Sequence, residues 1–414
     1  MILSGTQLLL IPLSFVCGRK SRPQQIKEKE HMTTKAKHNK SVTRPVSVSG
    51  DIQSPHSPAL GRRSFLARLG LGGTALLPAS GLLASRATTK ADGLGGGLSR
   101  GDAAILRLLA AAEILEADLW KQYQEISLGN PAFIQAIQVL DGDMPTYVRQ
   151  NTRDEISHAA FLNSYLAAKG RKQVNLEDFR SLPSSQATGS NKGAKRLTNL
   201  MNLTVDTSWF LRYRSPGNPD FGDTFPQIVN LVNVPGIPNG DLPAGGDDIQ
   251  VIANTAGFHF ATIEQGGSSL YESLLPKANS PEVVRIIGSI GGTEIQHFEL
   301  WQDKAGNAPP VPQATATRFP QLPVAPSMNG TTFFPGDGTD PASPQDTNQV
   351  FPFPCTFISP NLAPCSVIRP TSTQQAGAVA AFKGFVAMGL FQGQVDAFFD
   401  LVFELAEEAD EAGR

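Results

Sequence analysis

Two short stretches decide how this chain folds: Glu155-Ile156-Ser157-His158 and Glu294-Ile295-Gln296-His297. In an α-helix, residues three positions apart lie on the same face. Each stretch can therefore offer one carboxylate oxygen and one imidazole nitrogen to the same ion. The chain has only six histidines, so chance rarely produces two such motifs. The pattern indicates a metal site built on helices.

Both stretches lie in segments with the apolar periodicity of helices. The spacing of apolar residues predicts long helices over 102–127, 144–169, 249–275 and 281–304, and a short helix over 132–140. Ser280 is a typical N-cap, and Pro281 fits the first turn of the helix that follows. One further helix is predicted over 374–411, although its glycines weaken the middle. The prediction is an all-α protein.

The two long helices without the motif each carry a candidate carboxylate. Superposing them aligns Glu113 with Glu264 and Trp120 with Tyr271, seven residues further on. Glu116 is the alternative to Glu113, because it lies one turn on and on a similar face; Asp118 also competes. The order Glu, Glu-x-x-His, crossover, Glu, Glu-x-x-His suggests a duplicated helix pair.

This order resembles the ferritin-like superfamily, in which two helices give one Glu each and two give Glu-x-x-His. Within that superfamily, the sequence more closely resembles the exported bacterial branch related to desiccation-associated ferritin-like proteins. The resemblance covers about 100–170 and 249–304. It implies a ferritin-like four-helix bundle over 88–304, with a long crossover over 171–248.

The resemblance also implies a ligand set for two Fe or Mn ions. The shared ligands would be Glu155 and Glu294, which bridge the ions. Each ion would take one imidazole, from His158 or His297, and one terminal carboxylate, from Glu113 or Glu264. Carboxylates with one imidazole per ion suit iron or manganese better than zinc or copper.

Other residues are expected to support this set. Tyr271 could donate a hydrogen bond to a ligand, and Asp154 could orient the imidazole of the opposite motif. His259 lies off the ligand face and is expected to be a core or surface histidine. The pairs Gly266-Gly267 and Gly291-Gly292 are expected to allow close helix packing.

The net charge of −2 conceals two unlike parts. Residues 1–87 hold 13 Lys and Arg against 3 Asp and Glu, which leaves 22 basic and 34 acidic residues for the remainder. At the break, Arg62-Arg63-Ser64-Phe65-Leu66 resembles a twin-arginine export signal, followed by an apolar stretch and small residues. We expect 1–87 to be a leader read by the twin-arginine translocase, and the mature protein to be periplasmic or otherwise extracytoplasmic. Met32 as the true start, or a lipidated Cys17, are the alternatives.

The connections between the predicted helices are rich in turn residues. The chain has 39 Gly and 31 Pro, and we predict a Pro-rich wrap without helices over 305–370, followed by the C-terminal helix over 371–414. Only three cysteines are present, which excludes a disulfide scaffold. In an oxidising compartment, Cys355 and Cys365 are expected to form a local disulfide.

These features favour an exported oxidoreductase that acts on Fe(II) or consumes peroxide, with O2 or peroxide as reactant. The alternative is a structural or stress-protective bundle whose metal site is stabilising or vestigial. Iron storage is a weaker hypothesis, because the long connections hinder cage assembly. Nucleic acid is not an expected partner, since the mature body is acidic. The sequence leaves a homo-oligomer open.

Overall fold

The structure is a computed structural model, and it describes most of the chain from residue 97 onward. The described residues are 97–212, 227–312, 318–322, 349–351, 359, 361–362, 365–367 and 377–412. This part is mostly helical, which confirms the all-α prediction. None of its helices combines the length and the apolar character that crossing a bilayer requires. The predicted leader, the alternative start at Met32 and Cys355 lie outside the described residues.

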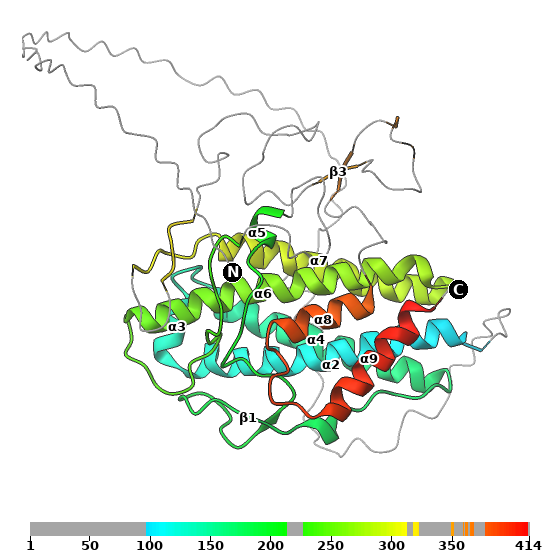
Figure 1. Ribbon diagram of the computed structural model, residues 1–414, viewed down its shortest axis with the longest axis horizontal. Coiled ribbons are helices and arrows are strands. Elements are labelled where there is room, and N and C mark those ends of the chain that lie inside the picture. Colours follow the sequence, from blue (N-terminus) through cyan, green and yellow to red (C-terminus); the bar gives the residue numbers. More distant parts are fainter. Residues whose placement is uncertain are drawn as a thin grey trace, which may run out of the picture. The chain divides into compact units, whose positions relative to one another are not determined.

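Four long helices carry the described body (Figure 1). They are α2 (Arg100–Gly129), α4 (Met144–Ala168), α6 (Asp247–Leu274) and α7 (Pro281–Ala305). α2 packs along α4, and α6 packs along α7. The predicted bounds of these four helices agree with the structure to within two residues at each end.

The remaining elements are short. The short helices are α3 (Pro131–Ile137), α5 (Trp209–Arg212), α8 (Ala378–Ala387), α9 (Asp396–Asp410) and the 3-10 turns η1 (Glu177–Phe179) and η2 (Leu275–Lys277). The strands form two antiparallel pairs, β1 (Leu182–Pro183) with β2 (Lys195–Arg196) and β3 (Gln349–Phe351) with β4 (Cys365–Val367).

Polar side chains cap two of the four long helices, α2 and α7, and the cap of α7 is the one that the sequence predicts. The Ser280 side chain begins α7 by accepting a hydrogen bond from the backbone N–H of Glu282. Ser99 does the same for α2 and accepts from the N–H of Asp102 at 2.9 Å. The Asp102 carboxylate in turn accepts from the N–H groups of Asn279 at 2.8 Å and Ser280 at 3.2 Å. The start of α2 is thereby tied to the start of α7.

Helix α6 is the central helix of the body. Of its 28 residues 24 are buried, whereas only seven of 25 are buried in α4. Two glycines allow α6 and α7 to approach closely, as expected. A Cβ on Gly267 would lie 2.8 Å from Oε2 of Glu294, and a Cβ on Gly291 would lie 2.8 Å from Cβ of Tyr271. Gly292 faces open space and serves no such contact.

The crossover between α4 and α6 is held to the body by buried groups. Asp118, which competed with Glu113 as a predicted ligand, accepts from the N–H groups of Leu197 at 2.9 Å and Thr198 at 3.0 Å. Trp209 and Phe210 are buried near the middle of the segment. The crossover also has short elements of its own, including the β1–β2 pair.

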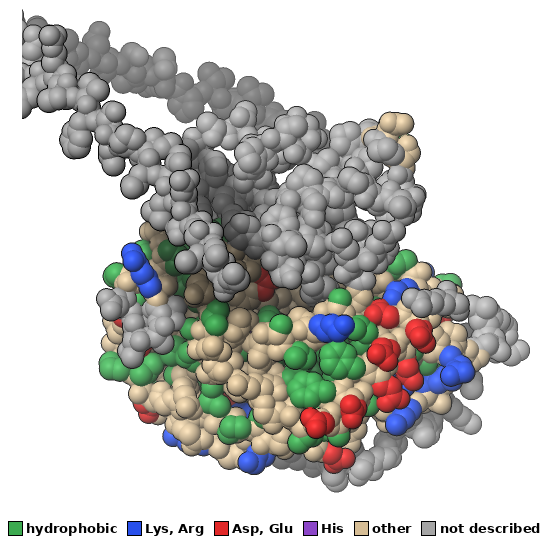
Figure 2. Space-filling view, in the orientation of Figure 1, with side chains coloured by type: hydrophobic (Ala, Val, Ile, Leu, Met, Phe, Trp, Pro, Cys, Tyr) green, Lys and Arg blue, Asp and Glu red, His purple; other side chains and the backbone are tan. Residues whose placement is uncertain are grey.

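The prediction of one C-terminal helix over 374–411 is wrong, because the segment forms two helices, α8 and α9. Between them, Gly389 has φ +78° and Gly393 has φ +94°, backbone conformations that interrupt a right-handed helix. The two helices pack against each other. In addition, α8 packs on α6 and α9 packs on α2. Figure 2 shows acidic side chains gathered over α9, whose exposed acids include Asp400, Glu404 and Glu407.

Candidate metal centre

The structure brings all six predicted ligands together between the four long helices. Their four carboxylates are at most 1% exposed, and the two imidazoles are 12% and 9% exposed. The ligands are Glu113 from α2, Glu155 and His158 from α4, Glu264 from α6, and Glu294 and His297 from α7. Each helix contributes to the cluster because helical spacing turns these side chains inward.

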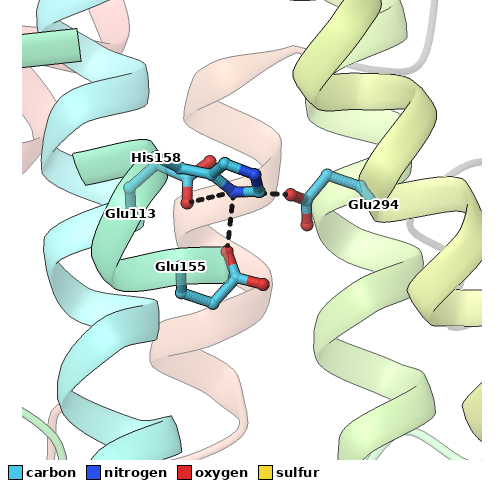
Figure 3. A group of neighbouring side chains, drawn as sticks. All are labelled: Glu113, Glu155, His158 and Glu294. Carbon is cyan, nitrogen blue, oxygen red and sulfur yellow. Dashed lines mark hydrogen bonds and ion pairs between the residues drawn. The ribbon is translucent and has the colours of Figure 1, made fainter. Parts of the chain in front are cut away.

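One group of ligand atoms surrounds the imidazole of His158 (Figure 3). Its Nδ1 lies 3.1 Å from Oε2 of Glu155, 3.3 Å from Oε2 of Glu113 and 3.4 Å from Oε1 of Glu294. Three helices therefore aim carboxylate oxygens at a single nitrogen.

A second group surrounds the imidazole of His297. Its Nδ1 lies 3.2 Å from Oε1 of Glu155 and 3.3 Å from Oε2 of Glu264. Glu294 also belongs to this group, and the ligand atoms within each group lie within 4.8 Å of one another. Both groups therefore contain Glu155 and Glu294, while each has its own imidazole and its own further carboxylate.

These distances fit metal ions better than hydrogen bonds. A single imidazole N–H can serve one of the three oxygens near it, yet Nδ1 of His158 faces all three. Metal–ligand bonds of about 2.1 Å at right angles place neighbouring ligand atoms about 3.0 Å apart. Both oxygens of Glu294 and Oε2 of Glu264 are buried with no hydrogen-bond partner among the described residues. The two groups could each hold a metal ion.

The two predicted supporting residues contact the ligands. Oδ2 of Asp154 lies 3.2 Å from Nε2 of His297, so the carboxylate orients the imidazole of the opposite motif. The hydroxyl of Tyr271 donates a short hydrogen bond to Oε1 of Glu113. In each ligand group, one residue outside the group thus fixes the orientation of a ligand side chain.

Two further supporting residues were missed by the sequence reasoning. The amide of Asn151 donates to Oε1 of Glu155 at 2.7 Å and to Oε1 of Glu264 at 2.9 Å. The indole N–H of Trp301 donates to Oδ1 of Asn151 at 2.7 Å, which fixes the amide orientation. Asn151 lies one turn before Glu155 on the buried face of α4, and that position was the available signal.

Glu116 is a fifth buried carboxylate beside the cluster, but it belongs to neither ligand group. Burial, and then the charges of Glu113 and Glu155, raise its pKa well above the ordinary value. Of the two, Glu113 belongs to a ligand group and Glu116 does not.

Without cations, the cluster retains protons. Burial and the neighbouring Glu113 and Glu264 raise the pKa of Glu155 to about 8, and burial with Glu155 raises that of Glu294 well above its usual range. Burial lowers the pKa of His158, but contacts with Glu113 and Glu155 outweigh it and raise the pKa to about 10. Two divalent ions would replace these protons.

His259 is a core histidine, which confirms its assignment away from the ligands. It is fully buried, and its Nδ1 lies 2.7 Å from the hydroxyl of Tyr123. Burial lowers its pKa to about 3, so the imidazole is neutral. The two ligand groups do not include it.

Neither a protein-family model, nor a curated protein, nor a solved structure matches this chain. The chemistry of the cluster therefore rests on its own geometry: oxygen-rich, buried, and built as two groups that share two carboxylates.

Proposed function

We propose that this chain is an exported ferritin-like protein whose four long helices form a bundle around a dimetal-carboxylate centre. The observation that carries the proposal is the sharing of Glu155 and Glu294 between two ligand groups. A shared carboxylate can bridge two ions, whereas two isolated sites would need separate ligands. The arrangement supports a pair of ions in contact with the same ligands.

The donor set favours iron or manganese as the bound metal. Hard carboxylate oxygens dominate, and each group has only one imidazole and no thiolate. Two such ions can change oxidation state in turn, which supplies the chemistry for oxidising Fe(II) or consuming peroxide. We propose an oxidoreductase of this kind.

The protein side chains then hold and protect the centre. Asp154 holds Nε2 of His297, and Asn151 holds Glu155 and Glu264, so these ligands would keep their direction around bound ions. The imidazoles of His158 and His297 are 12% and 9% exposed, whereas the four carboxylates are at most 1% exposed, so a small reactant would approach the centre past the imidazoles. In the metal-free protein the carboxyl groups of Glu155 and Glu294 hold protons, which two bound ions would displace.

Export of the loaded protein through the twin-arginine pathway is part of the proposal, because that pathway moves folded proteins. It rests on the paired arginines and the charge asymmetry of residues 1–87. The centre would then work in the periplasm.

The test is elemental analysis of the exported protein, combined with Fe(II) oxidation and peroxide consumption. About two Fe or Mn per chain are expected, with loss of the metal in Glu155→Gln and His158→Ala. Glu299→Gln is the matched control, because this exposed residue lies on α7 outside the cluster. Protein without metal after loading in the cytoplasm contradicts the proposal. Metal-dependent stability without turnover favours the structural, stress-protective alternative.

A further inference from the structure

A row of buried aromatic side chains leads away from the candidate metal centre. Its first member is Trp301, whose indole N–H bonds to Asn151, the residue that bonds to Glu155 and Glu264. Only one amide group therefore separates the Trp301 ring from two of the predicted ligands. Trp301 is fully buried.

The rings that follow Trp301 in this aromatic row are in contact with one another. Trp301 stacks on Trp120 with ring centroids 5.5 Å apart and planes 22° apart. The ring centroid of Phe260 lies 4.8 Å from the centroid of each of these rings, so Phe260 packs against the stack. Trp120 lies 5.9 Å from the ring of Tyr123. All four rings are at most 1% exposed, so they are shielded from bulk solvent.

The aromatic row ends at Tyr123, whose hydroxyl is hydrogen-bonded to an imidazole that can act as a base. The hydroxyl of Tyr123 lies 2.7 Å from Nδ1 of His259, and this imidazole is neutral and fully buried. Because the hydroxyl has no other acceptor among the described contacts, we assign its O–H as the donor and Nδ1 as the acceptor. Gly236 makes room for the hydroxyl, since a Cβ there would lie 2.5 Å from it.

We propose that Trp301, Trp120 and Tyr123 form a relay that carries one-electron oxidising equivalents from the metal centre to Tyr123. The inference rests on the proposed function for its oxidant, a metal ion oxidised by dioxygen or peroxide. One electron leaves Tyr123 through Trp120 and Trp301 and reduces that ion by one unit. The Oη–H bond breaks at the same time, and its proton passes to Nδ1 of His259. The products are a neutral tyrosyl radical and an imidazolium.

The geometry of the pair favours this proton transfer. An oxidised phenol is a far stronger acid than an imidazolium, even one whose pKa burial lowers to about 3. The hydrogen bond already joins the two atoms, so neither ring has to move. Tyr123 and His259 act on the proton and the electron, whereas Asn151 and Phe260 are positioning residues.

The first experiment uses the metal-loaded full chain, mixed with peroxide, freeze-quenched and examined by electron paramagnetic resonance. We expect a tyrosyl signal that ring-deuterated tyrosine narrows. Tyr123→Phe should reduce it at least tenfold and leave a tryptophan-centred signal instead. His259→Phe should do the same, whereas the double change Trp120→Phe and Trp301→Phe should abolish both signals.

Two variants serve as matched controls. Trp209 is equally buried, but its ring contacts are with Phe210, Phe258 and Phe298, which do not belong to the aromatic row. Tyr165 stacks on Phe161 at 6.2 Å. Trp209→Phe and Tyr165→Phe should retain the wild-type tyrosyl signal.

A second experiment separates the relay from the metal chemistry. In metal-free protein, a laser pulse ionises tryptophan, and transient absorption follows transfer of the oxidised state to tyrosine. The transfer should occur in the wild type and disappear in Tyr123→Phe. Absence of this transfer, or a wild-type tyrosyl signal in Tyr123→Phe, overturns the relay whatever the metal content. Failure to bind metal with intact transfer contradicts the proposed function alone.

Discussion

Replacing Gly267 by alanine tests whether the close contact of α6 with Glu294 shapes the metal centre. The new Cβ would lie 2.8 Å from Oε2 of Glu294. Non-bonded carbon and oxygen atoms normally lie about 3.5 Å apart, so the carboxylate must move by roughly 0.5 Å or more. Metal–ligand distances tolerate about 0.2 Å. The contact therefore displaces a carboxylate that both ligand groups share.

The expected effect is on metal affinity more than on folding. Changes to groups that merely orient ligands cost about 10- to 100-fold in metal affinity, and this change moves a ligand itself. We expect at least about 100-fold weaker binding, or about 2.8 kcal/mol. In the metal-free protein two effects on the free energy of unfolding oppose each other. Replacing a glycine inside a helix stabilises the fold by about 1 kcal/mol, whereas overpacking destabilises it by about 1–3 kcal/mol. The net loss of stability should therefore be at most about 2 kcal/mol.

The assay is competition between the protein and a chelator for Mn(II), with thermal unfolding of the metal-free form alongside. Gly292→Ala is the matched control, because that position has no atom within 4 Å of the new Cβ. It should bind metal normally and gain about 0.5–1 kcal/mol of stability. Wild-type affinity for two ions in Gly267→Ala would refute the reasoning, as would equal metal loss in Gly292→Ala.

Three further predictions concern the support of the ligands, the protons of the site and the C-terminal helices. Asn151→Ala removes donors from Glu155 and Glu264 and should weaken Mn(II) binding about 10- to 100-fold in the same chelator competition; unchanged affinity would show that the amide does not orient the ligands. In the metal-free protein the pKa of Glu155 is raised from 4.5 to about 8 and that of His158 from 6.5 to about 10, so the folded state binds more protons than the unfolded state and its stability falls as pH rises through this window. Because metal ions replace these protons, the difference in melting temperature between loaded and metal-free protein should widen from pH 5 to pH 8, and a constant difference would contradict the predicted protonation. Asp410→Ala removes the acceptor for the first N–H groups of α8 and the 2.8 Å ion pair with Lys277. It should therefore lower the free energy of unfolding by about 1–2 kcal/mol in urea titrations. The control is Glu404→Ala, because Glu404 is an exposed residue of α9, the helix that also holds Asp410, but has none of these contacts, and it should change the free energy of unfolding by less than about 0.5 kcal/mol.

Sequence alone determined the parts of this protein that depend on local spacing. The four long helices follow from apolar periodicity with capping residues such as Ser280, because helix formation depends on neighbours within one or two turns. The two Glu-x-x-His motifs are local in the same sense, since the helix itself places Glu155 beside His158. His259 could be placed off the ligand face because its angular position on α6 differs from that of Glu264, but its burial in the core came from the structure.

Only the tertiary structure decided the features that depend on distant segments. Glu113 and Glu116 share a helix face, so periodicity cannot rank them; the positions of His158 and Glu294 place Glu113 in the ligand group. Asn151 and Trp301 meet across 150 residues of sequence, and no local pattern encodes that contact. The break between α8 and α9 likewise required the left-handed backbone at Gly389 and Gly393, which a glycine permits but does not enforce. Local spacing fixes which side chains a helix can present, whereas packing between helices decides which of them meet.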